Sequence, residues 1–399
     1  MFFFFFFFDD YKDQKPTFKA NKGEWSELYT MFKLLGDGIL YAGDEKYNKR
    51  ENFFYPILSI LREEVVKKNK LKYKYNVSHV DNDITKPSEH VQIYQGEELI
   101  LDMDSRCFVE AAERLLKNIQ DGSGLSFYSS AGNEAFIKKI HCRNIKRDSD
   151  HKADITLKVY DSKVRITRVA GFSIKSLIGS NPTLLNASDA TLITYKIVGG
   201  SFIQEDIDYI NAITGNNKLK KRIAAIKNKG GNIVFKEYNN PTFRNNLESI
   251  DYGLPKVLAE AVLQYFSNNR ISMIDDIAEK IAITNPLQLE RSDKQKFYSD
   301  ILVKLLNASA AGMFPSKPYI KSDDVKGYII VRNDGEVVCY DFYEQNVVDK
   351  HLHDNTKFDT PSSEKKNKNG EYQRTPYCRL YRNDKGELEI QLNFQIRWT

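Results

Sequence analysis

Cysteine and tryptophan are scarce in this chain of 399 residues, which has four of the first and two of the second. The cysteines lie far apart without a CxxC pair, so zinc ribbons and dithiol redox motifs are excluded. Phe2–Phe8 is apolar, but it lacks a basic flank and a cleavage site and is far too short to span a bilayer. We therefore expect residues 1–18 to be a disordered leader, and the protein to be cytoplasmic with reduced thiols.

Apolar and charged residues make up 41% and 28% of the chain, as in globular proteins. The length suits one large domain or two ordinary ones, and either can bury a sizeable core. The net charge of +5 is compatible with a nucleic-acid partner, but an ordinary lysine-rich surface explains it equally well.

Apolar spacing predicts that the first 140 residues are mostly helical, with a short strand-like insert at 91–102. The helices expected in this part cover 24–36, 56–68, 105–121 and 131–141.

The pattern then changes to strands enriched in β-branched residues, and helices return between 204 and 306. This order indicates a mixed α/β fold without a regular βαβ repeat. The strands are expected at 153–160, 170–176 and 191–198, and the part from 316 to 399 is expected to be hairpin-rich, with turns at 333–335 and 383–386 and one final strand over 388–398.

One acid and one lysine stand on two of the predicted strands, in HKADI (151–155) and GFSIKS (171–176). Phosphodiester hydrolysis needs a divalent metal with hard oxygen ligands and stabilisation of charge on the phosphate. Asp154 could bind such a metal, and Lys175 could position the water and stabilise the charge. The D…SxK pattern is weak by itself, because any large protein contains several.

The register of the two strands decides whether Asp154 and Lys175 meet. If segment 161–169 is mainly a loop, Asp154 lies opposite Lys175. If the chain turns tightly at Asp161, Asp154 pairs near residue 169 and the two side chains separate. The sequence leaves both registers open.

A metal-dependent nuclease site usually carries a second acid two residues before the lysine, but this position is Ser173. Alternation puts Ser173 and Lys175 on one face of the strand, and Phe172 and Ile174 on the other. The first pair is therefore expected to face a site and the second pair a core.

Three places in the chain could supply the second acid of the metal site. Glu27 lies on the first predicted helix, where Glu24 is an equal candidate by composition. Glu134 lies on the helix before the strand pair, where a glutamate also complements the helix dipole. Asp189 follows the second strand, where an aspartate also serves as a helix cap.

With these segments in place, the chain resembles the HpaII family of type II restriction endonucleases. The resemblance runs in the family's order through nearly the whole chain after residue 20. It is carried by NKGEWSELY (21–29), HKADI (151–155), GFSIKSLIGSNPTLLNAS (171–188), NTKFDTPSS (355–363) and LNFQIRW (392–398).

The resemblance implies a nuclease of the PD-(D/E)xK superfamily, with a central mixed sheet flanked by helices. Asp154 would be the metal-binding aspartate and Lys175 the catalytic lysine. Ala153 replaces the usual proline and Ser173 the usual acid, and Ser173 is predicted to be a catalytic residue together with Asp154, Lys175 and Glu27. Glu27 is favoured as the second acid, because many superfamily members carry a metal-binding glutamate on the first helix.

Mg²⁺ is the implied cofactor, held by Asp154, Glu27 and the Ile174 carbonyl. The implied substrate is double-stranded DNA, cut at CCGG after the first cytosine to leave a 5′ phosphate. Residues 19–315 would form the endonuclease core, with catalytic strands near 153–198. The β-rich part, 316–399, would pack on the core and contact DNA.

Several side chains near the catalytic strands are candidates for DNA contacts. Two lysine clusters could bind phosphates, although solvated helix ends explain them equally well. The candidates are Lys152, Ser176, Asn186 and Ser188, then Arg374, Arg379 and Lys357 as possible readers of guanine, and the clusters at 67–74 and 218–229.

A palindromic target suits a homodimer, although a monomer that nicks twice is an alternative. A cognate methyltransferase is implied genetically rather than as a bound partner, and no membrane partner is expected. Two other classes remain open because Ser173 replaces an acid. One is a non-catalytic DNA-binding protein with a decayed nuclease core, and the other is a non-specific DNA-repair nuclease.

Overall fold

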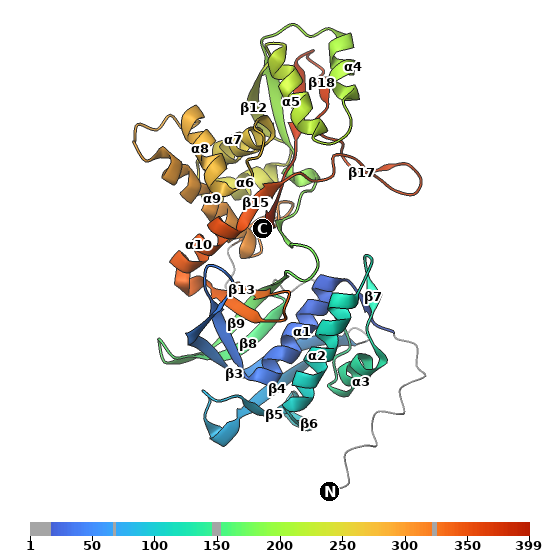
Figure 1. Ribbon diagram of the computed structural model, residues 1–399, viewed down its shortest axis with the longest axis vertical. Coiled ribbons are helices and arrows are strands. Elements are labelled where there is room, and N and C mark those ends of the chain that lie inside the picture. The colour runs from blue at the N-terminus through green and yellow to red at the C-terminus, as the bar shows by residue number, and fades with distance from the viewer. Residues whose placement is uncertain (1–16, 67–68, 146–152, 321–324) are drawn as a thin grey trace. The chain divides into compact units, whose positions relative to one another are not determined.

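The structure is a computed structural model that describes residues 17–66, 69–145, 153–320 and 325–399. The predicted leader lies almost wholly outside these residues. The chain forms two compact units (Figure 1). Among the described residues, unit 1 comprises 17–182 and 325–348, and unit 2 comprises 183–320 and 349–399.

Unit 1 is built on a mixed sheet. Its strands within the described residues are β2 (Ile39–Gly43), β3 (Lys49–Val66), β4 (Asn69–His79), β5 (Ser88–Gln95), β6 (Glu98–Asp104), β8 (Ile155–Asp161), β9 (Ile166–Ser176), β13 (Val325–Val331) and β14 (Val337–Asp341). They are ordered β2-β14-β13-β9-β8-β3-β4-β5-β6. β13 runs parallel to β9, and β14 runs parallel to β2, whereas the other neighbours are antiparallel. The predicted mixed α/β architecture is therefore confirmed.

The segment from Pro56 is part of strand β3, and the helix predicted there is wrong. Ile57 and Ile60 both belong to the core although they are three positions apart, because a bulge between Ile57 and Ser59 adds one residue to the strand. That spacing imitates the period of a helix. The first 140 residues contain all of β2 to β6, so the prediction that they are mostly helical is also wrong.

The other three helices predicted in this part are confirmed, as α1 (Lys22–Asp37), α2 (Arg106–Asp121) and α3 (Ala131–Lys139). α1 begins with a capping box between Asn21 and Glu24, and it ends at Gly38 in the left-handed conformation. A short pair of strands, β1 (Lys19–Ala20) and β7 (Phe127–Tyr128), joins the segments that precede α1 and α3.

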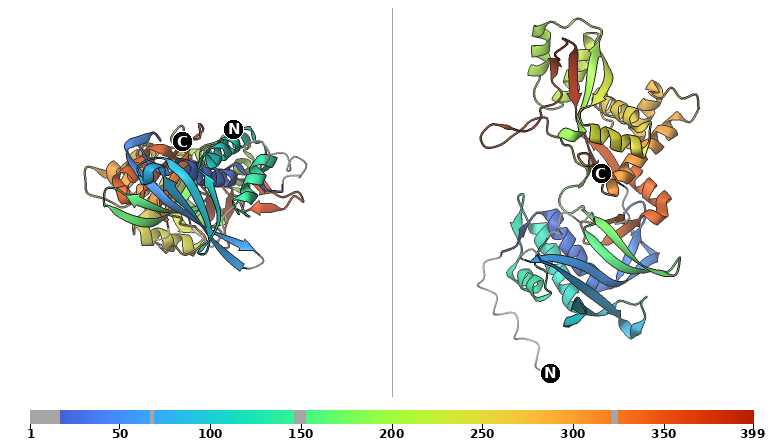
Figure 2. Two further views of the ribbon diagram at one scale, coloured as in Figure 1. Left: turned by 90° about the horizontal axis from the view of Figure 1, so that it is seen from below. Right: turned by 180° about the vertical axis from the view of Figure 1, so that it is seen from behind.

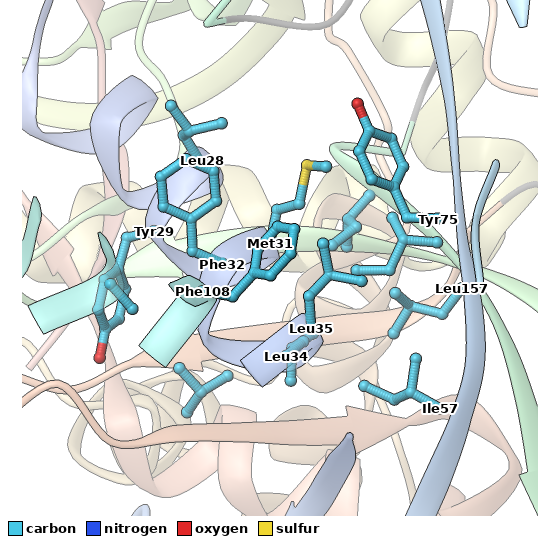
Figure 3. Packing of buried hydrophobic residues seen from close by; sticks show 14 of the residues in the cluster. Leu28, Tyr29, Met31, Phe32, Leu34, Leu35, Ile57, Tyr75, Phe108 and Leu157 are labelled. Atoms are coloured by element: carbon cyan, nitrogen blue, oxygen red, sulfur yellow. The ribbon is translucent and has the colours of Figure 1, made fainter. Parts of the chain in front are cut away.

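α1 and α2 cover one face of the sheet (Figure 1). Leu28, Phe32 and Leu35 of α1 are fully buried in the same core as Ile57 and Leu157 of the sheet (Figure 3). Burying each such side chain stabilises the fold by about 1.5–3 kcal/mol. This packing fixes α1 against the strands that carry the candidate site.

Unit 2 combines helices with antiparallel sheets, and α10 (Gln345–Asn355) carries the chain into it. Its sheets have the orders β12-β11-β19-β18 and β10-β20-β15, beside the β16-β17 pair. The helices are α4 (Gln204–Ala212), α5 (Lys218–Asn228), α6 (Pro241–Ile250), α7 (Leu254–Ser267), α8 (Ile274–Thr284) and α9 (Lys294–Ala310), and the strands are β10 (Thr183–Leu185), β11 (Ile193–Val198), β12 (Asn232–Tyr238), β15 (Thr356–Asp359), β16 (Lys365–Lys366), β17 (Tyr372–Arg374), β18 (Leu380–Arg382), β19 (Leu388–Leu392) and β20 (Gln395–Trp398).

The hairpins predicted near the C-terminus are present, as β13–β14 and β18–β19. The single strand expected over 388–398 is wrong, because it is split between β19 and β20 in different sheets. The break falls at Asn393, whose buried side chain accepts a hydrogen bond from Thr191 and donates one to the Ser188 carbonyl. Among the described residues, no helix is long and apolar enough to cross a membrane.

The turn at 333–335 generates a test of packing in unit 1. Gly335 has a φ of +88°, and a Cβ there would lie 2.4 Å from Leu116 Cδ2 and 2.7 Å from the Tyr29 hydroxyl. Gly96 has a similar φ of +61°, but its surroundings are open. Gly96→Ala should therefore lower the free energy of unfolding by only the backbone cost, about 1–2 kcal/mol.

Gly335→Ala should lower the free energy of unfolding by at least ~1 kcal/mol more than Gly96→Ala does, because the added methyl group overpacks the contact with α1 and α2. Denaturant unfolding of both variants measures the difference. Equal losses of unfolding free energy in the two variants would show that Tyr29 and Leu116 can shift without destabilising the fold.

Candidate active site

Asp154 lies immediately before β8, which pairs with β9 in a hairpin. The pairing runs from Ile155 opposite Phe172 to Asp161 opposite Ile166. The turn between them is short, yet Asp154 ends beside Phe172 and Ser173 and not near residue 169. The observed register lies between the two that the sequence left open.

Two hydrogen bonds hold Asp154 against β9. Its N–H donates to the Phe172 carbonyl at 2.9 Å, and its Oδ2 accepts the Ile174 N–H at 2.7 Å. Asp154 is half-buried, and its Oδ1 accepts no hydrogen bond from the described residues. The carboxylate is therefore fixed beside the residue that precedes Lys175, with one oxygen available to a ligand.

Lys175 and Ser173 project from β9 on the face opposite the core. Phe172 and Ile174 are 1% and 8% exposed and belong to the core cluster, which confirms the predicted alternation. Lys175 is half-buried and forms no ion pair with a described residue. β9 is an interior strand between β8 and β13, so the position of the lysine is fixed on both sides.

α1 is joined to the end of β9 by a side-chain hydrogen bond. The hydroxyls of Ser26 and Ser176 lie 2.8 Å apart, and Ser26 also donates to the Lys22 carbonyl at 2.7 Å. Glu27 follows Ser26, and Lys175 precedes Ser176. The contact therefore brings the segment that carries Glu27, which is half-buried, to the strand that carries Lys175. This pair of serines could not be predicted from the sequence, because the two residues are far apart in the chain and serine is a common residue.

Glu134 is engaged in contacts of its own. It accepts hydrogen bonds from the Thr17 N–H at 2.6 Å and the Thr17 hydroxyl at 2.5 Å, and Lys138 lies 2.9 Å away. Burial opposes its ionisation, but the bonds from Thr17 and Lys138 outweigh this effect and lower the pKa of Glu134. Through these contacts, the Glu134 carboxylate on α3 anchors the segment that precedes α1.

The segment after β9 contributes local structure to unit 2. Ser188 caps the short helix η2 (Asp189–Thr191) through a hydrogen bond to the Ala190 N–H. Asp189 is exposed and accepts the Thr375 N–H at 3.1 Å, and Asn186 is exposed. These residues belong to a different unit from Asp154.

The remaining candidates for DNA contacts are scattered. Lys152 and the side chain of Arg374 lie outside the described residues. Arg379 pairs with Glu364 at 2.5 Å, and Lys357 is half-buried on β15. Of the cluster at 67–74, residues 69–74 belong to β4, which pairs with β3, and not to a helix end, whereas residues 67–68 lie outside the described residues.

The cluster at 218–229 corresponds to α5. Its Arg222 is buried and donates to the carbonyls of Cys378, Asn211 and Ile213, so this arginine holds unit 2 together. Lys229 pairs with Asp206.

The oxygen atoms around Asp154 suit a hard divalent cation. Within the described residues, no three or more His, Cys, Asp and Glu side chains gather to hold a metal. A site of two carboxylates, a backbone carbonyl and water needs no such group. In an antiparallel ladder the N–H and C=O of a residue face the same neighbouring strand, so the Ile174 carbonyl faces the side where Asp154 lies.

Comparison with known proteins identifies the class of enzyme to which the chain belongs. A family model described as HpaII restriction endonuclease matches residues 21–398. The chain is 37% identical over 383 residues to the type II restriction enzyme HpaII of Haemophilus parainfluenzae, and the match covers 96% of this chain and 99% of that enzyme. No solved structure matches.

With a match of this extent, the molecule is a type II restriction endonuclease, an enzyme that hydrolyses DNA site-specifically. The chain belongs to the HpaII restriction endonuclease family. The predicted family and activity are confirmed.

The contacts of Glu134 generate a test of its role. Glu134→Gln should lower the free energy of unfolding by about 1–2 kcal/mol at pH 7, because the charge-assisted bonds to Thr17 and Lys138 are weakened. Since folding lowers its pKa, the difference from wild type should shrink as the pH falls below the usual value of ~4.3.

Thermal unfolding across this pH range measures the effect, with the exposed Glu113→Gln on α2 as the control. DNA cleavage at neutral pH should stay near the wild-type rate. A Glu134→Gln protein of normal stability that no longer cleaves would instead indicate a metal ligand.

Proposed function

We propose that this restriction endonuclease uses the PD-(D/E)xK mechanism, with Asp154 and Lys175 at its centre. The observation that carries the proposal is the hydrogen bond between the Ile174 N–H and the Asp154 carboxylate. The bond holds an acid at the start of β8 against the neighbouring strand β9, and Lys175 is the residue that directly follows the bonded amide. The mixed sheet covered by α1 and α2 is consistent with this superfamily.

Asp154, Glu27 and the Ile174 carbonyl would hold a divalent cation, for which we propose Mg²⁺. When bound, this ion would neutralise charge on the scissile phosphate and lower the pKa of a bound water. The hydrogen bond to Oδ2 leaves Oδ1 of Asp154 for this task.

Lys175 would orient the attacking water and stabilise the negative charge that grows on the phosphate. Its side chain lies on the face of β9 opposite Phe172 and Ile174, which fix the strand from the core side. Attack in line with the leaving 3′ oxygen would give a 5′ phosphate and a 3′ hydroxyl. Ser173, on the face of Lys175, would contribute a polar neighbour and no charge.

Glu27 remains our proposal for the second acid. The contact between Ser26 and Ser176 supports it, because it ties this part of α1 to the catalytic strand. Glu134 is the weaker alternative, since Thr17 and Lys138 already engage its carboxylate. Asp189 is the alternative from unit 2.

The target that the family resemblance suggests is CCGG, cut after the first cytosine. A palindrome of this kind suits a homodimer in the cytoplasm, in a cell that also carries a methyltransferase for the same site. Lys152, Ser176, Asn186 and Ser188 are proposed to contact DNA near the cut.

Digestion of plasmid DNA tests the catalytic centre. The wild-type enzyme should give discrete fragments with ends at CCGG in Mg²⁺, and none in EDTA. Asp154→Asn should lower the rate by about a hundredfold or more, because the charge is lost while an oxygen remains for the Ile174 N–H. DNA binding and thermal stability should persist. Cleavage by Asp154→Asn at the full rate would remove this residue from the site.

A second digestion assigns the other acid. Glu27→Gln should lose cleavage to a similar extent without losing stability, because a neutral amide binds the cation poorly. Glu24→Gln is the matched control on the same helix, since glutamine also fits a capping box. Full activity of Glu27→Gln together with inactivity of Asp189→Asn would transfer the role to Asp189.

A further inference from the structure

The sheet of unit 1 has a second face that α1 and α2 do not cover. In Figure 2, right, the strands of this unit lie in front of the two helices. Ile155, Leu157 and Val159 of β8 point into the core, so Lys158 projects to the opposite face. This is also the face of Lys175, because Phe172 and Ile174 of β9 point into the core.

A row of polar side chains crosses this face at the centre of the sheet. Lys158 pairs with Ser59 of β3, Ser59 pairs with Asn76 of β4, and Asn76 pairs with Gln92 of β5. Side chains directly opposite one another are about 5 Å apart at Cβ. Together with Lys74, these residues line a hollow of about 300 Å³.

Ser59 forms part of the lining and has an unmet hydrogen-bonding requirement. The residue is fully buried, and its hydroxyl has no hydrogen-bond partner among the described residues. An unsatisfied buried hydroxyl costs about 1–3 kcal/mol. An oxygen atom of a ligand in the hollow would remove that cost.

We propose that this hollow binds a backbone phosphate of the DNA duplex, away from the bond that is cut. Lys74 and Lys158 supply positive charge, and neither forms an ion pair with a described residue. Asn76 offers an amide donor, and Ser59 offers its hydroxyl.

Two of the acids on this face are paired with a base, and a third keeps its charge. Glu63 lies 3.7 Å from Lys70 and Asp104 lies 2.5 Å from Arg106, whereas Asp102 accepts hydrogen bonds from His90 and Gln92, and its single charge is outnumbered by Lys74 and Lys158. Asp102 belongs to β6 at the edge of the sheet, and it bounds the basic area on that side. The area therefore keeps a net positive charge facing solvent, which suits a phosphodiester backbone.

One lining residue of the hollow, Lys158, belongs to β8, the strand next to β9. Lys158 pairs with Val169 of β9, and Lys175 lies six residues further along that strand. At about 3.3 Å per residue the separation is ~20 Å, which corresponds to roughly six base-pair rises of DNA. The bound phosphate would flank the target, so the hollow would add affinity without reading sequence. That the phosphate lies ~20 Å from the cut rests on the proposed catalytic role of Lys175, whereas the binding of a phosphate rests only on the DNA substrate of the family.

Salt-dependent DNA binding tests the proposal, with a Lys74→Gln/Lys158→Gln double variant and a Lys117→Gln control. Lys117 is an exposed lysine of α2, on the covered face of the sheet. Binding to a duplex of about 30 base pairs is measured in EDTA, so the result is independent of the metal ligands. The double variant should bind more weakly, and the slope of log K against log salt should fall by ~1.8, about 0.9 for each lost contact.

Between about 50 and 200 mM salt, the double variant should therefore lose roughly tenfold less affinity than wild type. Lys117→Gln should match wild type. Wild-type affinity and slope in the double variant would overturn the proposal. So would an equal effect of Lys117→Gln, which would indicate a general effect of charge.

Ser59→Ala separates binding from structure. The substitution removes an unsatisfied hydroxyl, so thermal stability should stay unchanged or rise, while DNA affinity should fall by about tenfold. A loss of stability with unchanged affinity would show that the hydroxyl serves the fold, and it would also overturn the proposal.

Discussion

The hydrogen bond from the Ile174 N–H to the Asp154 carboxylate sets the geometry on which the proposed chemistry of unit 1 depends. It exists because β8 and β9 pair in one register, which the alternation of core residues on both strands enforces. A shift by one residue would turn Lys175 into the core and Ile174 into solvent. The apolar core therefore positions the polar site.

The bulge in β3 links two features of the sheet that look unrelated. It places Ile57 and Ile60 on the same face although they are three positions apart, and this spacing produced the wrong prediction of a helix. It also brings Ser59 into line with Lys158 and Asn76 in the polar row. The extra residue thus hides the period of a strand in the sequence, and in the fold it aligns the polar row on the face that α1 and α2 do not cover.

Ser173 stands where the usual acid is missing, and α1, which carries Glu27, is held against the same strand. The partly buried hydrogen bond between Ser26 and Ser176 ties this helix to the strand that carries Lys175. The core packing of Leu28 and Phe32 fixes the orientation of α1 along its length. In our proposal this helix supplies, through Glu27, the acid that the strand lacks. Glu134 accepts hydrogen bonds from Thr17 and pairs with Lys138.

From the sequence alone we could predict the family, the helices α1, α2 and α3, the strands β8 and β9, and the division of β9 into an apolar and a polar face. These features depend on local periodicity or on contiguous motifs, which a single chain displays directly. The three-dimensional fold was needed to establish the register at Asp154, the strand identity of β3, the break at Asn393 and the contact of Ser26 with Ser176. Each of these depends on residues that are distant in sequence, and their pairing is chosen by the packing of the whole core.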